Sequence, residues 1–322
     1  MSSITDIQGI KVGHASDFDS ITGCTVLIFD QPVNGAADLR GGGTSTRQID
    51  SLLSHNTFGK INAILLTGGS AFGLNASAGV MRYLEENSIG LDVGYNLVVP
   101  SVPTAVIFDL GIGNGRVRPD AEMGYEACDN TRTSNIEEGS VGVGTGATIG
   151  KLLGSEYATK GGIATLSVKL NSGVTIGVLV VVNAFGDVID PSNGGVIAGV
   201  RDETQKEIFP GTVNMMKKGI TRKPLNSGNT TLAVVATDAE FSKSELLRIS
   251  NIAQTGLARV ISPVHTVSDG DLVISVSCGE GKEDTNTVGV VAAELIEKAI
   301  IKAVGVAKSL GGVPSASELG TI

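Results

Sequence analysis

Two patterns of hydrophobic and polar positions run along the chain, and they predict a layered α/β protein in which helices cover an extensive sheet. Short runs rich in Val, Ile and Thr, each bounded by Gly, Asn, Asp or Ser, predict strands. These runs cover residues 25–29, 63–66, 104–108, 163–168, 174–183, 231–237 and 272–277. Apolar residues at helical spacing predict helices over 76–86, 243–260 and 288–310. Ser242 and Glu245 form a capping box at the start of the second helix.

Glycine is the compositional feature that stands out. The chain has 44 glycines among 322 residues, about twice the average usage of ~7%. Apolar residues make up 41% of the chain, which excludes a disordered protein, and no three-residue period indicates collagen. Glycine is therefore expected at tight turns and at places where backbones approach closely.

The charge and the cysteines argue against a nucleic-acid-binding protein and against a zinc site. Lys and Arg number 24 against 33 Asp and Glu, a net charge of −9 without a basic cluster, so no nucleic-acid partner is expected. The start of the chain lacks a secretory pattern, and the longest apolar stretch is far shorter than the ~20 residues of a membrane helix. Cys24, Cys128 and Cys278 lack zinc-site spacing and are expected to be buried, reduced thiols. We expect a cytoplasmic protein that does not enter a membrane.

Three glycine-rich segments are poor matches to known ligand-binding motifs. Residues 67–73 lie between a strand and a helix, but Phe72 and Leu74 stand where a nucleophile elbow needs Gly and a P-loop needs Lys. A tight turn is expected there, with a substrate-lining role as the alternative. Residues 142–147 fit G-x-G-x-x-A, yet residues 162–169 offer no acid to hold a ribose, so nicotinamide or flavin binding is not expected. Residues 111–115 are typical of a loop.

The most informative segment runs from Ser227 to Asp238, where a polar stretch enters a hydrophobic strand at Thr230. One interpretation is a loop that leads into a strand. The other is a self-cleaving junction, in which the Thr230 hydroxyl attacks the Asn229 carbonyl and hydrolysis of the ester frees Thr230 as a new N-terminus. Such a threonine carries its own base, because an α-amino group has a pKa of about 7.7–8. The chain has only three histidines, so few His-based triads are possible.

The chain resembles the P1 family of self-processing peptidases (peptidase family S58). That family includes L-aminopeptidase/D-esterases, β-peptidyl aminopeptidases and nylon-oligomer hydrolases. Nine segments carry the resemblance, in order along nearly the whole chain: residues 4–14, 39–42, 66–74, 102–110, 142–147, 160–163, 182–184, 228–231 and 262–271. The Asn229-Thr230 pair is most similar to the nylon-oligomer hydrolase branch.

The resemblance implies a fold and a processing event. The implied fold is a four-layer αββα sandwich, similar to the N-terminal-nucleophile (Ntn) hydrolases but with different connectivity. The implied organisation is one domain, residues 1–322, that cleaves itself into a 1–229 α chain and a 230–322 β chain. The two chains would stay associated, and cleaved protomers would form homo-oligomers of four or more.

The resemblance also implies a set of site residues. Thr230 matches the nucleophile, Asp269 and Asp271 match an acidic pair that orients it, and Asn183 matches an amide that holds the oxyanion. Alternate positions on an extended segment would place both carboxylates on one side. A simple Asp-Gly turn is the alternative for the pair, and a polar residue that closes a buried strand is the alternative for Asn183.

Two further residues match positions near the family's pocket. Lys160 is expected to take part in catalysis and Tyr157 in substrate binding, with a surface lysine and a partly buried tyrosine as the alternatives. Tyr157 follows from spacing alone, within a variable stretch over residues 151–159.

The expected function is hydrolysis of a small or linear amide through an acyl-enzyme, with no metal or organic cofactor. Peptides, D-amino-acid amides, β-peptides and 6-aminohexanoate oligomers are all substrates within the family, and the sequence does not choose among them. An uncleaved member that acts as a binding or structural protein is the alternative.

Overall fold

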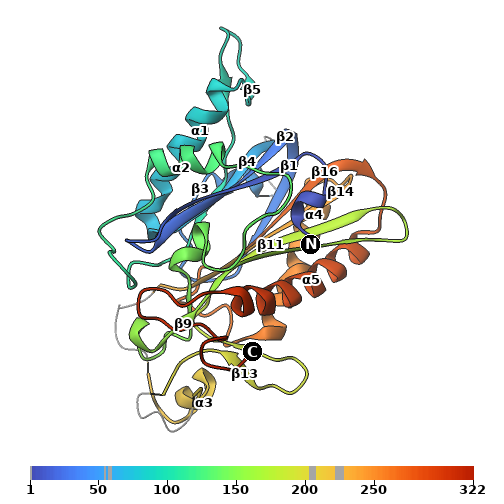
Figure 1. Ribbon diagram of the computed structural model, residues 1–322. Helices are drawn as coiled ribbons and strands as arrows, with labels where there is room; N and C mark the ends of the chain where they lie inside the picture. Colours follow the sequence, from blue (N-terminus) through green and yellow to red (C-terminus); the bar gives the residue numbers. More distant parts are fainter. Residues whose placement is uncertain (1, 54–55, 57–59, 203–207, 222–227) are drawn as a thin grey trace.

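The computed structural model describes residues 2–53, 56, 60–202, 208–221 and 228–322 (Figure 1). Ser227, at the start of the polar segment before the expected junction, lies outside the described residues.

A nine-stranded sheet forms the framework of the molecule. Its main path has the order β10-β11-β14-β16-β2-β4-β7-β3, and β1 pairs with β2 beside it. Among the strands that the structure describes in this sheet, β14–β16 and β4–β7 pair in parallel and the other pairs are antiparallel. The strands are β1 (Ile10–Asp17), β2 (Thr22–Leu39), β3 (Thr46–Arg47), β4 (Lys60–Thr67), β7 (Thr104–Val106), β10 (Gly162–Lys169), β11 (Thr175–Asn183), β14 (Thr230–Ala239) and β16 (Leu272–Gly281).

The long strand β2 connects two halves of this sheet that stack face to face. Its first part pairs with β1 and β4, its last part pairs with β16, and the register shifts between Ile28 and Val33. Leu27 and Phe29 of β2 share one buried core with Leu232 and Val234 of β14. This core lies between the two sheet halves, and we call it the inner core.

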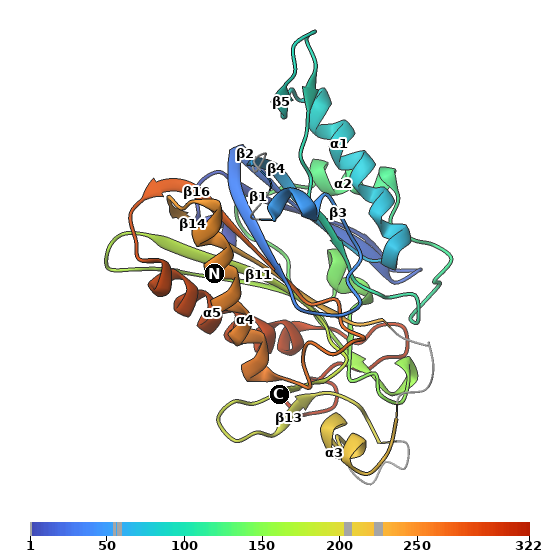
Figure 2. The ribbon, with the colours of Figure 1, turned by 180° about the vertical axis from the view of Figure 1, so that it is seen from behind.

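Helices cover the outer face of each half. Alternate side chains of β14, Ala233 and Val235, point away from the inner core and pack against α4 (Lys243–Val260) and α5 (Thr285–Val306). On the other half, Val26 and Ile28 of β2 pack against α1 (Ala76–Glu86) and α2 (Ala121–Asp129). Figures 1 and 2 show the two helix pairs on opposite sides of the sheets. The predicted four-layer αββα sandwich is confirmed.

Shorter elements complete the structure. They are β5 (Leu91–Asp92) and β6 (Val98–Val99), which form a projecting hairpin, β8 (Thr148–Ile149), β9 (Thr159–Lys160), β12 (Asp187–Ile189), β13 (Val196–Ala198), β15 (Ile261–Ser262), α3 (Thr212–Lys217), and the 3₁₀ turns η1 (Ile4–Asp6), η2 (Ile49–Leu52), η3 (Ser70–Asn75), η4 (Gly142–Gly146) and η5 (Ser155–Tyr157).

The helices agree closely with the sequence pattern. α1 and α4 have the predicted bounds, and the Ser242–Glu245 capping box is formed, with the Ser242 N–H donating to the Glu245 carboxylate at 2.8 Å. The third predicted helix, 288–310, begins earlier, because Asp284 caps it by accepting from the Thr287 N–H, and ends earlier, at Val306. All seven predicted strand runs overlap observed strands, whereas β1 and α2 were not predicted.

The glycine segment 67–73 is the expected tight turn between β4 and η3. Gly69 and Ser70 both have positive φ, +79° and +53°. The buried Asp109 carboxylate holds the turn, because it accepts from the Gly69 N–H and the Thr22 hydroxyl, each at 2.7 Å. Burial raises the pKa of Asp109. Segment 142–147, by contrast, begins as the buried 3₁₀ turn η4 and does not link a strand to a long helix.

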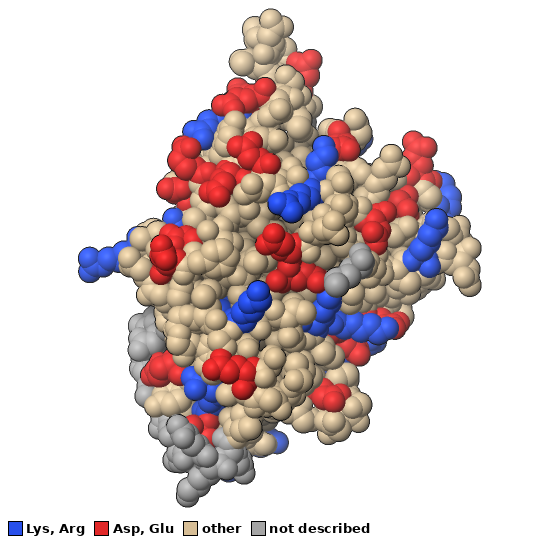
Figure 3. Space-filling view, in the orientation of Figure 1, with Lys and Arg blue, Asp and Glu red and all other residues tan. Residues whose placement is uncertain are grey.

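The cysteines and the surface add two observations. Cys24 and Cys128 are buried free thiols as predicted, but Cys278 is half-buried, in the more exposed last part of β16. On the face drawn in Figure 3, acidic and basic side chains are interspersed among the described residues, without a continuous basic patch. None of the helices in the described residues is long and apolar enough to cross a membrane.

Candidate active site

The site forms at the end of the inner core, where three strands start or stop together. Thr230 is the first residue of β14 and lies directly opposite Asn183, the last residue of the antiparallel β11. Directly opposed residues of an antiparallel pair have Cβ atoms about 4.5–5.5 Å apart on one face of the sheet. Because β16 runs parallel to β14, Asp269 and Asp271, just before β16, reach the same edge.

The bond between Asn229 and Thr230 is buried and its carbonyl has two donors. The Thr230 hydroxyl contacts the Asn229 carbonyl oxygen, and the Gly270 N–H donates to that oxygen at 2.8 Å. Asn229 and Thr230 are both buried. The Gly270 N–H polarises the carbonyl toward nucleophilic attack, and among the described residues the one hydroxyl that contacts this carbonyl belongs to the next residue.

The two aspartates are buried, and each accepts three hydrogen bonds. Asp271 accepts from the Thr231 N–H at 2.6 Å with one oxygen, and from the His265 N–H at 3.0 Å and ring Nδ1 at 2.9 Å with the other. Asp269 accepts from the Phe185 N–H at 3.1 Å, and from the N–H and hydroxyl of Thr266. Burial, and next the charge of Asp271, raise the pKa of Asp269 to about 6, against the lowering effect of the Thr266 hydrogen bonds.

Asn183 is held in one orientation. Its side-chain oxygen accepts from the Thr148 N–H at 3.0 Å and from the Lys151 ammonium at 2.6 Å, so its NH2 group points the other way, toward the Phe108 carbonyl at 3.3 Å. An amide fixed in this way presents donors on the side away from the lysine.

Lys151 is a site residue that the sequence interpretation missed. It is fully buried, and its ammonium also donates to the backbone carbonyls of Asn183 at 3.1 Å and Gly228 at 3.2 Å. It therefore links the amide of Asn183 to the backbone just before the junction. The sequence did contain a signal for this residue, because Lys151 stands between Ile149-Gly150 and Leu152-Leu153. A lysine in such an apolar run is expected to be buried, and a buried lysine needs hydrogen-bond partners.

Lys160 lies in the neighbouring hairpin and does not hydrogen-bond to the junction. It is fully buried, which rules out a surface lysine, and its ammonium donates to the carbonyls of Gly144 at 3.2 Å, Ala147 at 2.7 Å and Gly161 at 3.3 Å. Burial lowers its pKa to about 7, and the Asp109 charge acts in the opposite direction. Its connection to the site is indirect, through the Ala147–Thr148 peptide, whose N–H donates to Asn183.

Tyr157 is partly buried and packs in a small apolar cluster that includes Phe185, whose N–H donates to Asp269. The structure thus brings together Thr230, Asn183, Asp269 and Asp271, and Tyr157 packs against the apolar cluster that contains Phe185.

Glycines around the junction are explained by close approach. A Cβ on Gly228 would lie 2.5 Å from Cβ of Phe108, one on Gly270 would lie 2.9 Å from the Thr230 hydroxyl oxygen, and one on Gly41 would lie 2.2 Å from the Asp269 carbonyl oxygen. The predicted motif at 39–42 packs its backbone against the aspartates, with the Arg40 N–H donating to the Asp271 carbonyl at 3.0 Å. A Cβ at Gly41 or Gly228 would clash with these atoms, and one at Gly270 would require the Thr230 hydroxyl to shift.

Among the described residues, no three or more His, Cys, Asp or Glu side chains gather closely enough to hold a metal ion. The functional groups that the structure gathers at the junction are a hydroxyl, two carboxylates, an amide and an ammonium group.

Two relatives can be aligned with this chain over most of its length. An uncharacterized aminopeptidase of Mycobacterium leprae is 39% identical, covering 98% of this chain and 93% of its own. A 6-aminohexanoate-oligomer endohydrolase of Kocuria sp. is 27% identical, covering 92% of this chain and 84% of its own.

Solved structures share the fold. The L-aminopeptidase D-Ala-esterase/amidase of Ochrobactrum anthropi, described as a variant of the Ntn hydrolase fold, superposes with a TM-score of 0.75 at 19% identity, covering 99% of this chain and 92% of that one. A β-aminopeptidase of Burkholderia sp. superposes with a TM-score of 0.65 at 23% identity, covering 94% and 86%.

The match to the family itself is nearly complete along the chain. The model of peptidase family S58 matches residues 2–317, which span the junction, both aspartates and all the strands that hold them. With the αββα layers and the shared aminopeptidase relatives, this match shows that the chain belongs to peptidase family S58.

Proposed function

We propose that this protein is a self-processing amide hydrolase whose nucleophile is the hydroxyl of Thr230, freed as an N-terminal residue. Membership of a peptidase family supports amide hydrolysis. The observation that carries the finer proposal is the contact of the Thr230 hydroxyl with the Asn229 carbonyl, which also accepts from the Gly270 N–H.

The first reaction cleaves the chain. The Thr230 hydroxyl oxygen attacks the carbonyl carbon of Asn229, the Gly270 N–H donates to the developing oxyanion, and the hydroxyl proton passes to the departing Thr230 nitrogen. An ester between Asn229 and Thr230 replaces the amide. Water hydrolyses this ester, which yields the Asn229 carboxylate and a Thr230 with a free amine and hydroxyl.

The second reaction repeats the chemistry on a substrate. The free amine of Thr230 takes the hydroxyl proton, the oxygen attacks a substrate amide, and the Nδ2 of Asn183 donates to the oxyanion. Asp271 fixes the nucleophile by holding the Thr231 N–H at 2.6 Å, and Lys151 fixes the Asn183 amide at 2.6 Å. Water then releases the acyl group.

The relatives support a small or linear amide with a free amine as the substrate. One is named as an aminopeptidase and another as a 6-aminohexanoate-oligomer endohydrolase. We propose aminoacyl amides and short linear oligomers as the substrate class.

The proposal is tested with Thr230→Ala and Thr230→Ser. Hydrolysis of p-nitroanilides of L-Ala, D-Ala and β-Ala and of a 6-aminohexanoate dimer would be followed for each purified protein. We expect Thr230→Ala to lose at least about 1000-fold in rate on every substrate that the wild type hydrolyses, because the nucleophile is gone. Thr230→Ser, which keeps a hydroxyl, should retain measurable activity. A wild type that hydrolyses none of these amides and stays uncleaved would instead favour a binding or structural role.

A further inference from the structure

The two site aspartates are held by one dipeptide, His265-Thr266. The N–H of His265 at 3.0 Å and its ring Nδ1 at 2.9 Å both reach Oδ2 of Asp271. The N–H of Thr266 at 3.0 Å and its hydroxyl both reach Oδ2 of Asp269. Each residue thus gives one backbone donor and one side-chain donor to a single carboxylate oxygen.

The backbone of the dipeptide is shaped for this task. His265 has a φ of +55°, a left-handed conformation that costs a non-glycine residue free energy and persists only where the surroundings enforce it. Successive N–H groups in such a conformation can point toward anions on one side of the chain. The Thr266 carbonyl is fixed in turn, because it accepts from the N–H groups of Asp269 at 3.1 Å and Gly42 at 3.3 Å.

The second oxygen of each carboxylate, Oδ1, contacts the site. Oδ1 of Asp271 accepts from the Thr231 N–H, the amide next to the nucleophile, and Oδ1 of Asp269 accepts from the N–H of Phe185, two residues after Asn183. Each carboxylate therefore connects the dipeptide directly to a backbone N–H at or next to the end of a strand that carries Thr230 or Asn183.

We propose that His265 and Thr266 are positioning residues that clamp Asp271 and Asp269, and through them fix the strand ends that carry Thr230 and Asn183. The effect on catalysis rests on the function proposed above. The hydrogen bonds of the clamp can be tested by NMR, independently of any hydrolase activity.

The ring of His265 acts through Nδ1 alone. A neutral ring that donates from Nδ1 carries no proton on Nε2, and Nε2 is buried without a hydrogen-bond partner among the described residues. Asparagine reproduces the donor at the δ position and tolerates the left-handed backbone, whereas glycine tolerates the backbone but has no side-chain donor. Likewise, serine keeps the hydroxyl of Thr266, and valine keeps its shape without the hydroxyl.

The kinetics of these four variants separate the effect of losing a side-chain hydrogen bond from the effect of changed packing. We expect His265→Gly and Thr266→Val each to lower kcat and the self-cleavage rate by about 10- to 100-fold, with KM within about three-fold, as expected for hydrogen bonds to charged groups. His265→Asn and Thr266→Ser should stay within about three-fold of wild type. Equal rates for His265→Gly and His265→Asn, or for Thr266→Val and Thr266→Ser, would overturn the proposal.

Two NMR measurements test whether His265 and Thr266 donate to the aspartates, even if the protein shows no hydrolase activity. The ¹⁵N shifts of the His265 ring should place its proton on Nδ1 and should change in Asp271→Asn. The Asp269 carboxyl, followed by its ¹³C shift, should titrate near pH 6 in the wild type, and its pKa should rise by about one unit in Thr266→Val, which loses a donor to the charged form. A proton on Nε2, or an unchanged Asp269 titration, would overturn the clamp and leave the proposed function standing.

Discussion

At the scale of single residues, the space around the Thr230 hydroxyl is set by Gly270. A Cβ at this position would lie 2.9 Å from the hydroxyl oxygen and 3.3 Å from the Gly43 carbonyl oxygen, so a methyl group must displace one of them. Gly270 has no positive φ, and alanine is therefore acceptable to its backbone.

We expect Gly270→Ala to slow cleavage at Asn229–Thr230 by about 10- to 100-fold, because a small displacement of a nucleophile is costly. The measurement is the fraction of cleaved chain against time on a denaturing gel. Gly305→Ala is the matched control, since its Cβ would lie no closer than 3.4 Å to its nearest neighbour, Ile322. Cleavage of Gly270→Ala at the wild-type rate would show that the contact does not constrain the nucleophile.

Lys160 gives a residue-scale prediction on pH. The folded chain holds this lysine with a pKa of about 7, whereas the ordinary value is 10.5, so between these pH values the unfolded chain binds a proton that the folded chain does not. The free energy of unfolding should therefore rise with pH in this window, relative to Lys160→Met, by roughly 1 kcal/mol per pH unit. Urea unfolding at pH 7 to 10, in a Thr230→Ala background that keeps the chain intact, measures it. A difference that stays constant with pH would contradict the burial effect.

Part of the site could be predicted from the sequence and part could not. The pairing of Thr230 with Asp269 and Asp271 followed from a resemblance, and the structure brings these residues together; their catalytic roles stay predictions. Lys151 was missed because a long side chain makes its contacts far from its own backbone position, which local pattern does not show. Lys160 was expected to take part in catalysis because the resemblance matches it to a position near the family's pocket. Its ammonium donates to backbone carbonyls of η4 and the residues next to it, and its catalytic role stays a prediction.

At the scale of elements, buried strands and capped helices were the predictable parts. Runs such as 231–237 are continuous because both faces of the strand are buried, and α4 was placed to the residue by its capping box. The second part of β2 was not predicted, because Asp30, Gln31 and Pro32 interrupt its apolar pattern where the strand passes between sheet halves. α2 is short and mixes Glu and Gly with its few buried residues, so its periodicity is weak.

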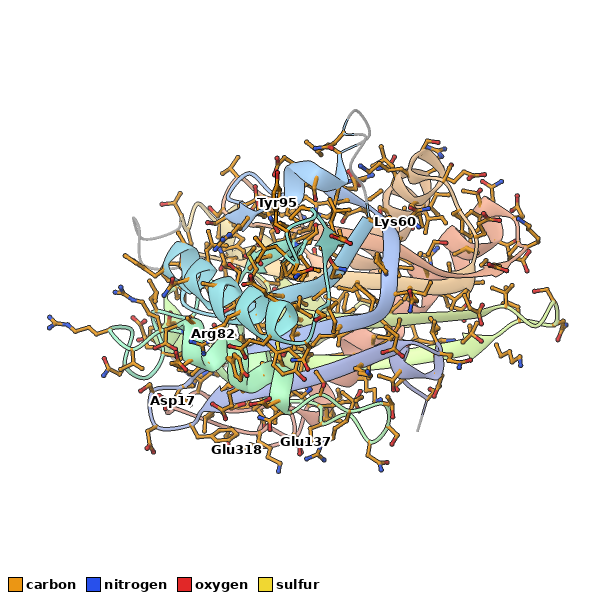
Figure 4. All side chains as sticks on the ribbon, turned by 90° about the horizontal axis from the view of Figure 1, so that it is seen from above. Asp17, Lys60, Arg82, Tyr95, Glu137 and Glu318 are labelled. Carbon is orange, nitrogen blue, oxygen red and sulfur yellow. The ribbon has the colours of Figure 1, made fainter. Side chains whose placement is uncertain are left out.

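The β5–β6 hairpin yields an element-scale prediction. It projects beyond the layers (Figure 1) and exposes the apolar side chains of Leu91, Leu97 and Val99. Tyr95, at its tip, is 93% exposed. Figure 4 looks down on it, with Tyr95 and the Arg82 side chain of α1 labelled. Exposed apolar side chains gathered on one element indicate an interaction surface, and we expect the homo-oligomer implied by the family resemblance to use it.

We expect Tyr95→Glu combined with Leu97→Glu to lower the molar mass measured by light scattering. Phe18→Glu, which alters an exposed aromatic residue outside the hairpin, is the control and should leave the mass unchanged. An unchanged oligomer in the double variant would assign the interface to another surface.

At the scale of the whole molecule, the two expected fragments are interleaved in one sheet. β14 and β16 belong to residues 230–322, yet they lie between β11 and β2 of residues 1–229 in the sheet order. Separation of the fragments would break the ladders β11–β14 and β16–β2 and expose the inner core. Cleavage at the junction therefore breaks one peptide bond at the start of β14, and the inner core still holds the two fragments together.

We predict that the cleaved fragments co-elute in native size-exclusion chromatography and separate only in denaturant. Each fragment alone should be insoluble or unfolded, because loss of the ladders β11–β14 and β16–β2 leaves unpaired strand edges on both fragments. Fragments that separate under native conditions would contradict the interleaved sheet.

The central claim, that Thr230 is freed by cleavage at Asn229–Thr230, is tested most directly by intact-mass spectrometry of the purified wild-type protein after incubation at neutral pH, beside Thr230→Ala. We expect two chains in the wild type, with masses of residues 1–229 and 230–322 and a free Thr230 amine on the smaller, and one uncut chain in Thr230→Ala. A wild type that stays at its full 32.8 kDa after long incubation while it hydrolyses amides would contradict the claim.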